Sequence, residues 1–329
     1  MTENPKSGVA GWVGYRPDIR ILDCSVRDGG LINDHQFDDG FVKSVYATAV
    51  EAGVDYFEIG YKASKRIYAP SEHGAWKYCD EDAVRRIVGD NPTGPKVTVM
   101  ADVDRTDYKT DILPREKTVI GCVRVACYIH QIPAAMDMIA DATEKGHETM
   151  LQLMAVSTVP ESELRAGLEL AARCSAQAVY IVDSFGAMYS EQVRQLTALY
   201  MGMLKGTDKE VGFHGHNNRQ LAFANTVEAI VSGANRVDAT ISGIGRGAGN
   251  CPMELLIGFL HNPKFKQRPV LKCCRDVFLP LSKKMDWGYS IPYAITAQLN
   301  LHPREAIAMR ASENPDDYVA FFDQIVQEE

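Results

Sequence analysis

The strongest constraint on the fold is a regular alternation of short, β-branched apolar runs with amphipathic helical stretches. Eight such runs occur, at 19–26, 54–59, 96–101, 119–128, 149–156, 178–182, 210–214 and 236–241. Strands that alternate with helices indicate βαβ units around a parallel sheet. Eight repeats predict an α/β chain folded as a closed (β/α)8 TIM barrel.

The segments between the runs support this interpretation. Five of them place apolar residues at helical spacing among good helix formers: 39–52, 132–145, 161–174, 190–204 and 220–232. A long loop at 63–80 carries tyrosine, tryptophan and histidine residues. Long loops after barrel strands are more often functional than idle.

The chain divides into two predicted regions. A catalytic barrel is expected at 18–263, and a basic, proline-terminated break at 264–269 opens a C-terminal helical region, 264–329. This region is apolar and aromatic enough to pack on the barrel or on a partner subunit. We therefore expect a homo-oligomer held through the C-terminal helices.

Composition limits the partners and the compartment. A chain of 329 residues with 46% hydrophobic content can bury a large core, and its net charge of -8 disfavours nucleic acids and anionic membranes as partners. No apolar stretch of the ~18 residues needed to cross a bilayer is found, nor is an N-terminal signal sequence. The eight cysteines form no CxxC pair, a pattern typical of reduced thiols in a cytoplasmic protein.

The first candidate site is Arg27-Asp28-Gly29-Gly30, directly after the first run. Reacting groups of barrel enzymes project from the C-terminal ends of strands. The sequence would therefore place a guanidinium and a carboxylate at the barrel mouth. A buried salt bridge that caps the barrel is an equally good interpretation of this pair alone.

The second candidate site is His214-Gly215-His216 at the end of the seventh run. Histidines at i and i+2 point to the same side of a strand, so both imidazoles can bind one ion. With a separate carboxylate nearby, metal ligation is favoured over packing. The glycine-rich stretch 243–250 lacks the spacing of a phosphate loop and fits a lid hinge with an amide ligand, Asn250, better.

Four motifs together carry a family resemblance. VRDGG, FHGHNN, IVDSFGAM and GIGRGAGN, in this order at the strand ends, resemble the metal-dependent aldolase and acyl-transfer superfamily. That superfamily includes 4-hydroxy-2-oxovalerate aldolase, hydroxymethylglutaryl-CoA lyase and isopropylmalate synthase. The resemblance spans 21–259, and RVACY and YIVDSFGAM make it closest to 4-hydroxy-2-oxovalerate aldolase.

The resemblance implies a site and a reaction. It makes Asp28, His214 and His216 ligands of a divalent metal ion, with Asn250 as a further ligand, and it favours manganese, with magnesium or zinc as alternatives. It assigns Arg27 to the enolate oxygen. Ser184 matches a position near the substrate. The implied reaction breaks or forms a carbon–carbon bond of a small-molecule 4-hydroxy-2-oxo acid through a pyruvate enolate.

One part of the family pattern is missing. The aldolases keep a base histidine where this chain has Leu31, and the condensing enzymes keep a glutamate where it has Gly30. We expect His35 on the same loop to act as the base, because histidine titrates near working pH. Glu58 is expected to orient Arg27 at the substrate site, and Tyr289 to reach in from the helical tail. Other substitutes for the base are Asp34, Lys62, Tyr128, His130 and Tyr293.

Two other functions remain open at this point. A Claisen-type synthase would join an acyl-CoA to a 2-oxo acid, but the missing glutamate argues against it. A non-catalytic metal-binding barrel would explain the missing base, although such a protein has no reason to keep Arg27.

Overall fold

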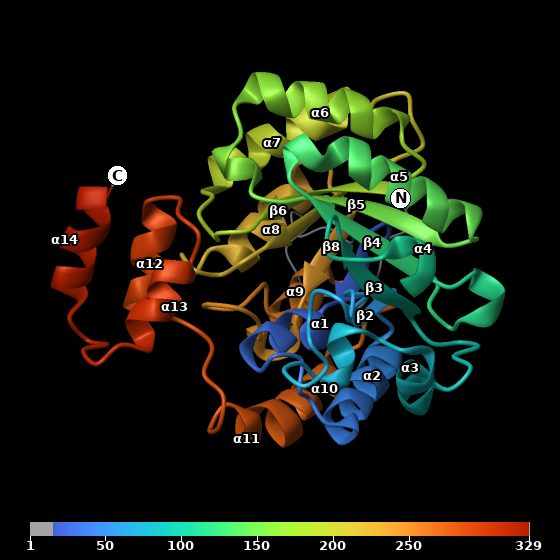
Figure 1. The fold of residues 1–329 in the computed structure, drawn as a ribbon, viewed down its shortest axis with the longest axis horizontal. Coiled ribbons are helices and arrows are strands. Elements are labelled where there is room, and N and C mark those ends of the chain that lie inside the picture. Colours follow the sequence, from blue (N-terminus) through green and yellow to red (C-terminus); the bar gives the residue numbers. More distant parts are fainter. Residues whose placement is uncertain (1–15, 329) are drawn as a thin grey trace.

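The computed structural model describes residues 16–328, and in it eight parallel strands close into a barrel (Figure 1). This architecture confirms the predicted TIM barrel. The strands follow one another around the barrel in chain order: β1 (Arg20–Asp23), β2 (Tyr56–Tyr61), β3 (Lys96–Asp102), β4 (Cys122–Cys127), β5 (Glu148–Leu153), β6 (Ala178–Asp183), β7 (Glu210–Gly215) and β8 (Arg236–Ala239).

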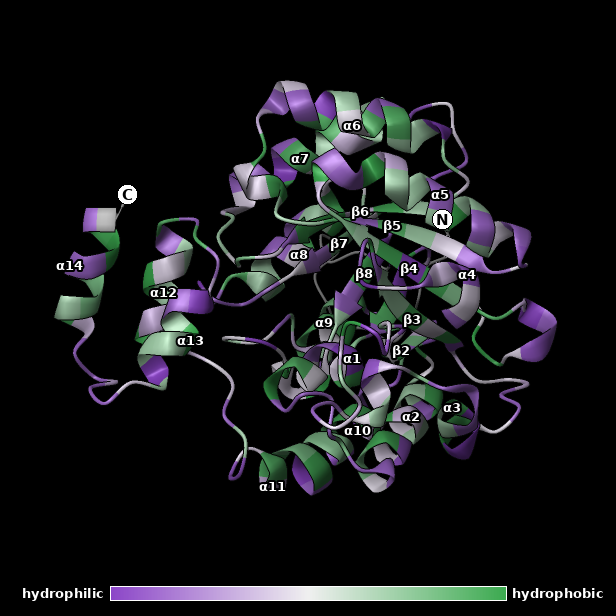
Figure 2. Ribbon diagram, viewed as in Figure 1, coloured by the Kyte–Doolittle hydropathy of each residue, from purple (hydrophilic) through white to green (hydrophobic). Residues whose placement is uncertain are grey.

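Helices surround the strands, and the five helical segments predicted from the sequence are present as α2, α5, α6, α7 and α8. The α-helices up to the end of the barrel are α1 (Ser25–Gly29), α2 (Asp39–Ala52), α3 (Glu81–Val88), α4 (Tyr108–Asp111), α5 (Ile132–Glu144), α6 (Glu161–Arg173), α7 (Ser190–Met203), α8 (Ala222–Val231), α9 (Met253–Leu260) and α10 (Gln267–Cys273). Figure 2 shows that these helices mix hydrophilic and hydrophobic residues, as expected of helices with one buried face.

The first predicted strand, 19–26, was too long. β1 ends at Asp23, and Ser25–Gly29 forms a short helix. Asp23 Oδ1 accepts a hydrogen bond from the Ser25 backbone N–H at 2.8 Å, and Ser25 Oγ accepts one from the Ile241 backbone N–H at 2.8 Å. Such local side-chain bonds compete with strand pairing and stabilise the turn. The predicted charged pair therefore lies on a helical turn and not at a strand end.

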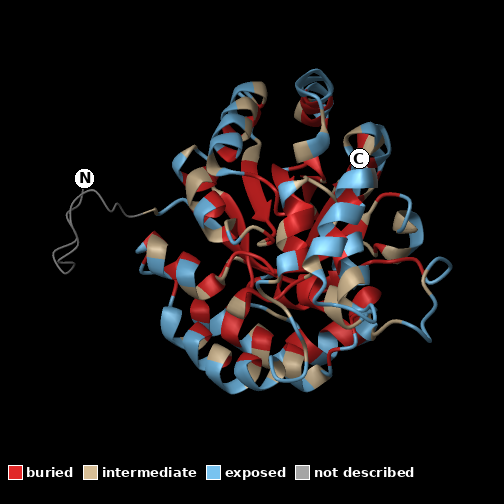
Figure 3. Ribbon diagram, turned by 90° about the vertical axis from the view of Figure 1, so that its left-hand side faces the viewer, coloured by how far each residue is buried: buried red, intermediate tan, exposed pale blue. Residues whose placement is uncertain are grey.

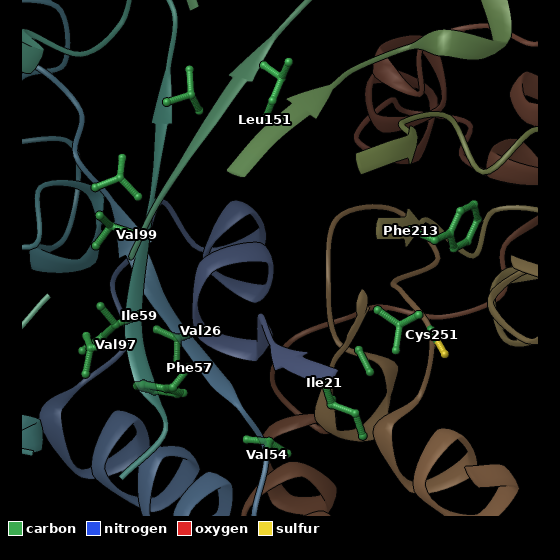
Figure 4. Close-up of a cluster of buried hydrophobic side chains, with 14 of the residues drawn as sticks. Ile21, Val26, Val54, Phe57, Ile59, Val97, Val99, Leu151, Phe213 and Cys251 are labelled. Carbon is green, nitrogen blue, oxygen red and sulfur yellow. The ribbon is translucent and has the colours of Figure 1, made fainter. Parts of the chain in front are cut away.

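Alternation along each strand separates two layers of side chains. On β2, Phe57 and Ile59 point outward and pack with Val97 and Val99 of β3 in the apolar layer beneath the helices (Figure 4). Each large side chain buried in this way contributes roughly 1.5–3 kcal/mol. Figure 3 shows the result, with buried strands inside helices whose outer faces are exposed.

The opposite strand faces fill the barrel interior and are partly polar. At the N-terminal end of the barrel, Arg236 donates hydrogen bonds to Glu148 at 2.6 Å and to the Tyr56 hydroxyl at 2.9 Å. This cluster closes the bottom of the barrel. The polar residues nearer the C-terminal ends of the strands form the candidate site.

The predicted C-terminal region, 264–329, has two parts in the structure. Its first helix, α10, packs against α2, and the Lys266 backbone N–H donates to Ala52 O at 2.9 Å. A π-helix (Cys274–Phe278) and α11 (Leu279–Leu281) follow it. The chain then forms α12 (Ile291–Gln298), α13 (Arg304–Arg310) and α14 (Tyr318–Glu328), which lie together at the side of the barrel (Figure 1).

The last three helices share an apolar cluster of their own. Tyr293, Ala306 and Phe321 pack together with Ala248, which belongs to the loop after β8. The helices thus contact the glycine-rich loop at the mouth of the barrel. Within residues 16–328, no helix has the length and apolarity that crossing a bilayer requires.

Candidate active site and metal centre

A cavity of about 470 Å³ opens at the C-terminal ends of the strands. Each of the eight strands contributes a lining residue from its end or from the loop that follows. The polar and charged lining residues are Arg27, Tyr61, Lys77, Asp102, Asp104, Arg105, Tyr128, Gln131, Gln152, Ser184, His214, His216, Arg246, His302 and Arg304. Active sites of TIM barrels occupy this face.

Asp28 lies beside the two histidines of the His-x-His pair. Its side chain is fully buried, and Asp28 Oδ2 is 3.4 Å from His214 Nε2 and 3.9 Å from His216 Nε2. Two atoms that each lie about 2.0–2.2 Å from one ion are about 3–4 Å apart. Burial opposes the charged form, but Arg27 and the two histidines outweigh it and hold the pKa of the Asp28 carboxyl well below its usual range.

His214 is oriented by a second carboxylate. Its Nδ1–H donates to Asp238 Oδ2 at 2.9 Å, which leaves the Nε2 lone pair directed toward Asp28. Burial lowers the pKa of His214, but the nearby carboxylates of Asp238 and Asp28 outweigh this and raise it. Carboxylate–histidine pairs of this kind are typical of metal centres.

Asn250 fits the same centre. It forms an isolated antiparallel bridge with His216, and its Nδ2 donates to Ile244 O at 3.0 Å. Its Oδ1 is buried without a hydrogen-bond partner. A Cβ atom added at Gly245 would lie 2.0 Å from Asn250 Nδ2 and 3.2 Å from Asp28 Oδ1. Only glycine therefore leaves room for the Asn250 amide and the Asp28 carboxylate at this point. Asp28, His214, His216 and Asn250 thus bring nitrogen and oxygen donors to one part of the barrel mouth, and the Asn250 oxygen, without a hydrogen-bond partner among the described residues, is a donor of the kind that divalent ions take.

Cys24 offers a different third donor. Its thiol groups with Asp28 and His214, with the potential ligand atoms within 4.8 Å of one another. Cys24 is therefore an alternative to His216 as the third donor, since a thiol binds a metal ion as the thiolate. Burial raises the pKa of the Cys24 thiol well above its usual range.

Arg27 adjoins this centre on the same helical turn. Its Nη1 donates to Asp28 Oδ2 at 2.9 Å and its Nε donates to Glu58 Oε2 at 2.6 Å. The guanidinium lines the cavity, whereas the Glu58 side chain is fully buried beneath it. Glu58 therefore holds Arg27 in place, as expected from the sequence, and does not itself line the cavity.

A buried arginine connects the two orienting carboxylates. Arg124 of β4, with a fully buried side chain, donates to Glu58 Oε2 at 3.0 Å and to Asp238 Oδ2. A third bond, of 2.8 Å, goes to Gln152 Oε1. Arg124 thus links the carboxylate that holds Arg27 to the carboxylate that holds His214.

Arg124→Met is expected to lower the free energy of unfolding by about 3–5 kcal/mol, because Glu58 and Asp238 would each lose a buried partner. Chemical denaturation measures the change. Arg194→Met is the matched control, because its pair with Glu228 is exposed and should contribute at most about 1 kcal/mol. Equal losses in the two variants would contradict the assigned network.

The structure does not bring His35 or Tyr289 into the cavity. His35 is 2% exposed, and its ring packs against Gly30. A Cβ atom added at Gly30 would lie 2.3 Å from His35 Nδ1. Burial lowers the pKa of His35 to about 3, and the positive charge of nearby Lys77 adds to this effect. Tyr289 is 66% exposed, on the segment before α12. These placements do not support the two residues as substrate contacts, because neither side chain lines the cavity.

Ser184, in contrast, lines the cavity at the end of β6. Its Oγ accepts a hydrogen bond from the Ala155 backbone N–H at 2.8 Å, which fixes the hydroxyl. Of the substitute bases that the sequence suggested, only Tyr128 is among the lining residues.

Several residues that line the cavity were not predicted from the sequence. Lys77 lies in the long loop already expected to be functional, whereas Arg246 stands within the glycine-rich stretch. His302 and Arg304 come from the start of α13 and the segment before it. No local pattern marks these last two, because only the packing of the C-terminal helices brings them over the barrel.

Known proteins resemble this chain over most of its length. The HMGL-like family model matches residues 18–277. An oxaloacetate decarboxylase of Mycobacterium tuberculosis is 32% identical over 246 residues, which cover 73% of this chain and 69% of the relative. A 4-hydroxy-2-oxovalerate aldolase of Mycolicibacterium paratuberculosis is 32% identical over 241 residues, covering 73% and 67%.

Solved structures share the fold. The N-terminal domain of a putative aldolase from Bacteroides vulgatus has a TM-score of 0.75 at 26% identity and covers 90% of this chain and 98% of that one. Hydroxymethylglutaryl-CoA lyase from Pseudomonas aeruginosa has a TM-score of 0.65 at 16% identity, with 82% and 95% covered. The chain is a carbon–carbon lyase and belongs to the HMGL-like family.

Proposed function

We propose that this enzyme is a divalent-metal-dependent aldolase that cleaves or forms a carbon–carbon bond of a 4-hydroxy-2-oxo acid through a pyruvate-type enolate. The observation that carries the proposal is the approach of Asp28 Oδ2 to both His214 Nε2 and His216 Nε2, with Arg27 alongside at the cavity. The name of the mycobacterial aldolase supports the substrate class.

Asp28, His214 and His216 would hold the ion, with Asn250 next to them, and manganese is the proposed metal, with magnesium or zinc as alternatives. When bound, such an ion supplies a Lewis acid for the 2-oxo group of the substrate.

Other residues that line the cavity position the substrate and stabilise its enolate. Arg27 presents N–H donors next to the ligand carboxylate, where they can stabilise an enolate oxygen without reorganisation, because Glu58 and Asp28 already hold the guanidinium. The fixed Ser184 hydroxyl can donate to the substrate. Leu31 and Met100 give the cavity an apolar wall that limits access of water to the enolate.

Decarboxylation of a 2-oxo acid is a second candidate, and Leu31 favours it. Cleavage of a 4-hydroxy-2-oxo acid requires a group that accepts the hydroxyl proton, and the cavity presents Leu31 on the loop where the aldolases keep a histidine. Loss of carbon dioxide from a 3-carboxy-2-oxo acid also leaves a pyruvate enolate but needs no such acceptor. The oxaloacetate decarboxylase relative supports this candidate.

The manganese-loaded protein is expected to exchange the methyl protons of pyruvate for deuterium, because enolisation is common to both candidates. Proton NMR measures the exchange. Cleavage of a panel of 4-hydroxy-2-oxo acids and release of carbon dioxide from oxaloacetate then assign the reaction. Thiol release from acetyl-CoA with pyruvate would instead indicate a Claisen-type synthase, and a protein with none of these activities would be a non-catalytic barrel.

The same assays test His35 as the base. Because its side chain does not line the cavity, His35→Gln is expected to retain both exchange and any aldol cleavage within about tenfold. Lost cleavage with intact exchange would reinstate His35 as the proton acceptor.

We also propose that the chain forms a homo-oligomer through α12–α14. Ile291, Ile307, Val319 and Phe322 are apolar and at least 38% exposed on these helices. Exposed apolar groups of this kind mark interaction surfaces. Light scattering would give the mass, and a monomer at micromolar concentration would contradict the proposal. A cytoplasmic location is proposed from the eight free cysteines.

A further inference from the structure

The cavity is larger than the pyruvyl part of the proposed substrate. At about 470 Å³ it has room for roughly fifteen water-sized groups, since one water takes about 30 Å³ in the liquid, whereas pyruvate has six non-hydrogen atoms. The remainder of the cavity must therefore receive the rest of the substrate. The groups that line it indicate what that part of the substrate carries.

Lys77 is the most unusual of these groups. It ends the short 3-10 helix Ala75–Lys77 in the loop between β2 and α3, and its backbone N–H donates to Gly74 O at 3.1 Å. Only 9% of the residue is exposed, although it lines the cavity. The ammonium lies 4.8 Å from the ring centroid of Tyr61 and 4.1 Å from that of Tyr68. These contacts hold a buried cation at the cavity wall.

The Lys77 ammonium forms no salt bridge among the described residues. The carboxylates of Asp102 and Asp34 act on it electrostatically from beyond that range, whereas Arg105 opposes it. Burial lowers the pKa of Lys77, because the ammonium has lost hydration. A cation at the wall of a ligand cavity, with no carboxylate within 4.0 Å among the described residues, is a favourable partner for a bound anion.

The charge of the whole cavity also favours an anionic ligand. Five cationic residues line it, and of these Lys77, Arg246 and Arg304 have no salt bridge among the described residues, whereas Arg27 is paired with Asp28 and Glu58. The acidic lining residues are Asp102 and Asp104, and the chain as a whole carries a net charge of -8. Asp102 pairs with Arg105 at 3.8 Å, and Asp104 accepts a hydrogen bond from Gln131 at 3.0 Å. A positive cavity in an acidic protein favours an anionic ligand.

Lys77 lies at a suitable distance from Arg27. The Arg27 guanidinium carbon is 6.0 Å from the centroid of the Tyr61 ring, and Lys77 Nζ is 4.8 Å from the same centroid. The two cations are therefore at most about 11 Å apart, the sum of these distances. A chain of at most five or six carbons is therefore long enough to join them, at about 1.3 Å per bond along an extended chain and a hydrogen bond at each end.

We propose that Lys77 forms an anion-binding subsite for the far end of the substrate, so that the 2-oxo acid carries a second anionic group, a carboxylate or a phosphate, within about five carbons of its first. This inference rests on the proposed function for the position of the 2-oxo acid end beside Arg27. It makes Lys77 a specificity-determining residue for the part of the substrate that is not pyruvate.

A matched pair of ligands tests the subsite directly. 2-Oxoglutarate and 2-oxovalerate have the same five-carbon chain and differ only in a carboxylate or a methyl group at C5. Titration calorimetry on the manganese-loaded protein is expected to show that 2-oxoglutarate binds about 10–100-fold more tightly, the range of one charge-assisted hydrogen bond. Inorganic phosphate added to the pyruvate-loaded protein tests the phosphate alternative, and binding in either arm identifies the group.

Variants assign the effect to the lysine. Lys77→Met is expected to abolish the preference, and Lys77→Arg to restore at least part of it, which shows that a loss in Lys77→Met is not a folding defect. Lys65→Met is the matched control, because Lys65 is on the same loop but pairs with Asp80 outside this cavity. The subsite would be overturned if the two acids bound with equal affinity and phosphate did not bind. It would also be overturned if the preference for 2-oxoglutarate survived in Lys77→Met.

Binding is measured apart from turnover, so the two proposals fail separately. Exchange of the pyruvate methyl protons without an anion preference would remove the subsite and leave the proposed function. An anion preference in a protein without exchange, cleavage or decarboxylation would remove the function and leave the subsite.

Discussion

His216→Ala is expected to lower the affinity for the divalent ion by more than about a hundredfold and to abolish turnover at limiting metal. Loss of a residue that only orients a ligand typically costs 10–100-fold in metal affinity, and loss of the ligand itself should cost more. His216 Nε2 is 3.9 Å from Asp28 Oδ2, close enough for both atoms to bind one ion. Titration with manganese, followed by calorimetry, measures the loss.

Cys24→Ala is the decisive control for this prediction. Cys24 is the other residue whose potential ligand atom lies close to those of Asp28 and His214, but the proposed site takes its second imidazole from the His-x-His pair. The alanine variant should therefore bind the ion as the wild type does. The opposite pattern, with metal lost in Cys24→Ala and kept in His216→Ala, would reassign the third ligand.

Arg27→Lys is expected to bind metal normally but to lose about 10²–10³-fold in kcat, the usual loss when one oxyanion donor is removed. Lysine keeps the charge but lacks the planar fork, so it cannot hold Glu58 and Asp28 at 2.6 and 2.9 Å and still donate into the cavity. Steady-state kinetics on the preferred substrate, together with deuterium exchange into pyruvate, measure the effect.

Arg236→Lys provides a matched control for Arg27→Lys. Arg236 is also buried and paired with carboxylates, but it lies at the opposite end of the barrel. Its replacement should reduce stability while leaving the kcat of the folded enzyme unchanged. If Arg27→Lys retained the wild-type kcat, Arg27 would have no part in the chemistry.

The sequence alone determined the barrel and the core of the candidate centre. Alternating strand and helix periods specify βαβ units, because each element must bury one apolar face, and eight units close the sheet. Within β7, the two-residue period requires His214 and His216 to share a face, so their juxtaposition was predictable. Glu58 was also expected beside Arg27, and the structure places the two side chains 2.6 Å apart.

Other parts of the site depend on contacts between residues far apart in the chain. Asp238 and Arg124 are charged residues within apolar runs, and although Arg124 opens the RVACY motif, no local pattern assigns either residue a role in orienting the site. Their role appears only because barrel closure brings β4 and β8 into contact through the interior. Similarly, His35 failed to reach the cavity because the turn after α1 directs its ring against Gly30.

The mouth of the cavity was decided by tertiary structure in the same way. Lys77 reaches the wall because a loop of the β2–α3 connection folds over Tyr61, and Arg304 does so because α12–α14 pack on the loop after β8. Local periodicity specifies which face of an element is buried, but it carries no information on which distant element covers that face. The sequence therefore determined the scaffold and the candidate metal-binding motif, whereas only long-range packing decided which cations line the cavity.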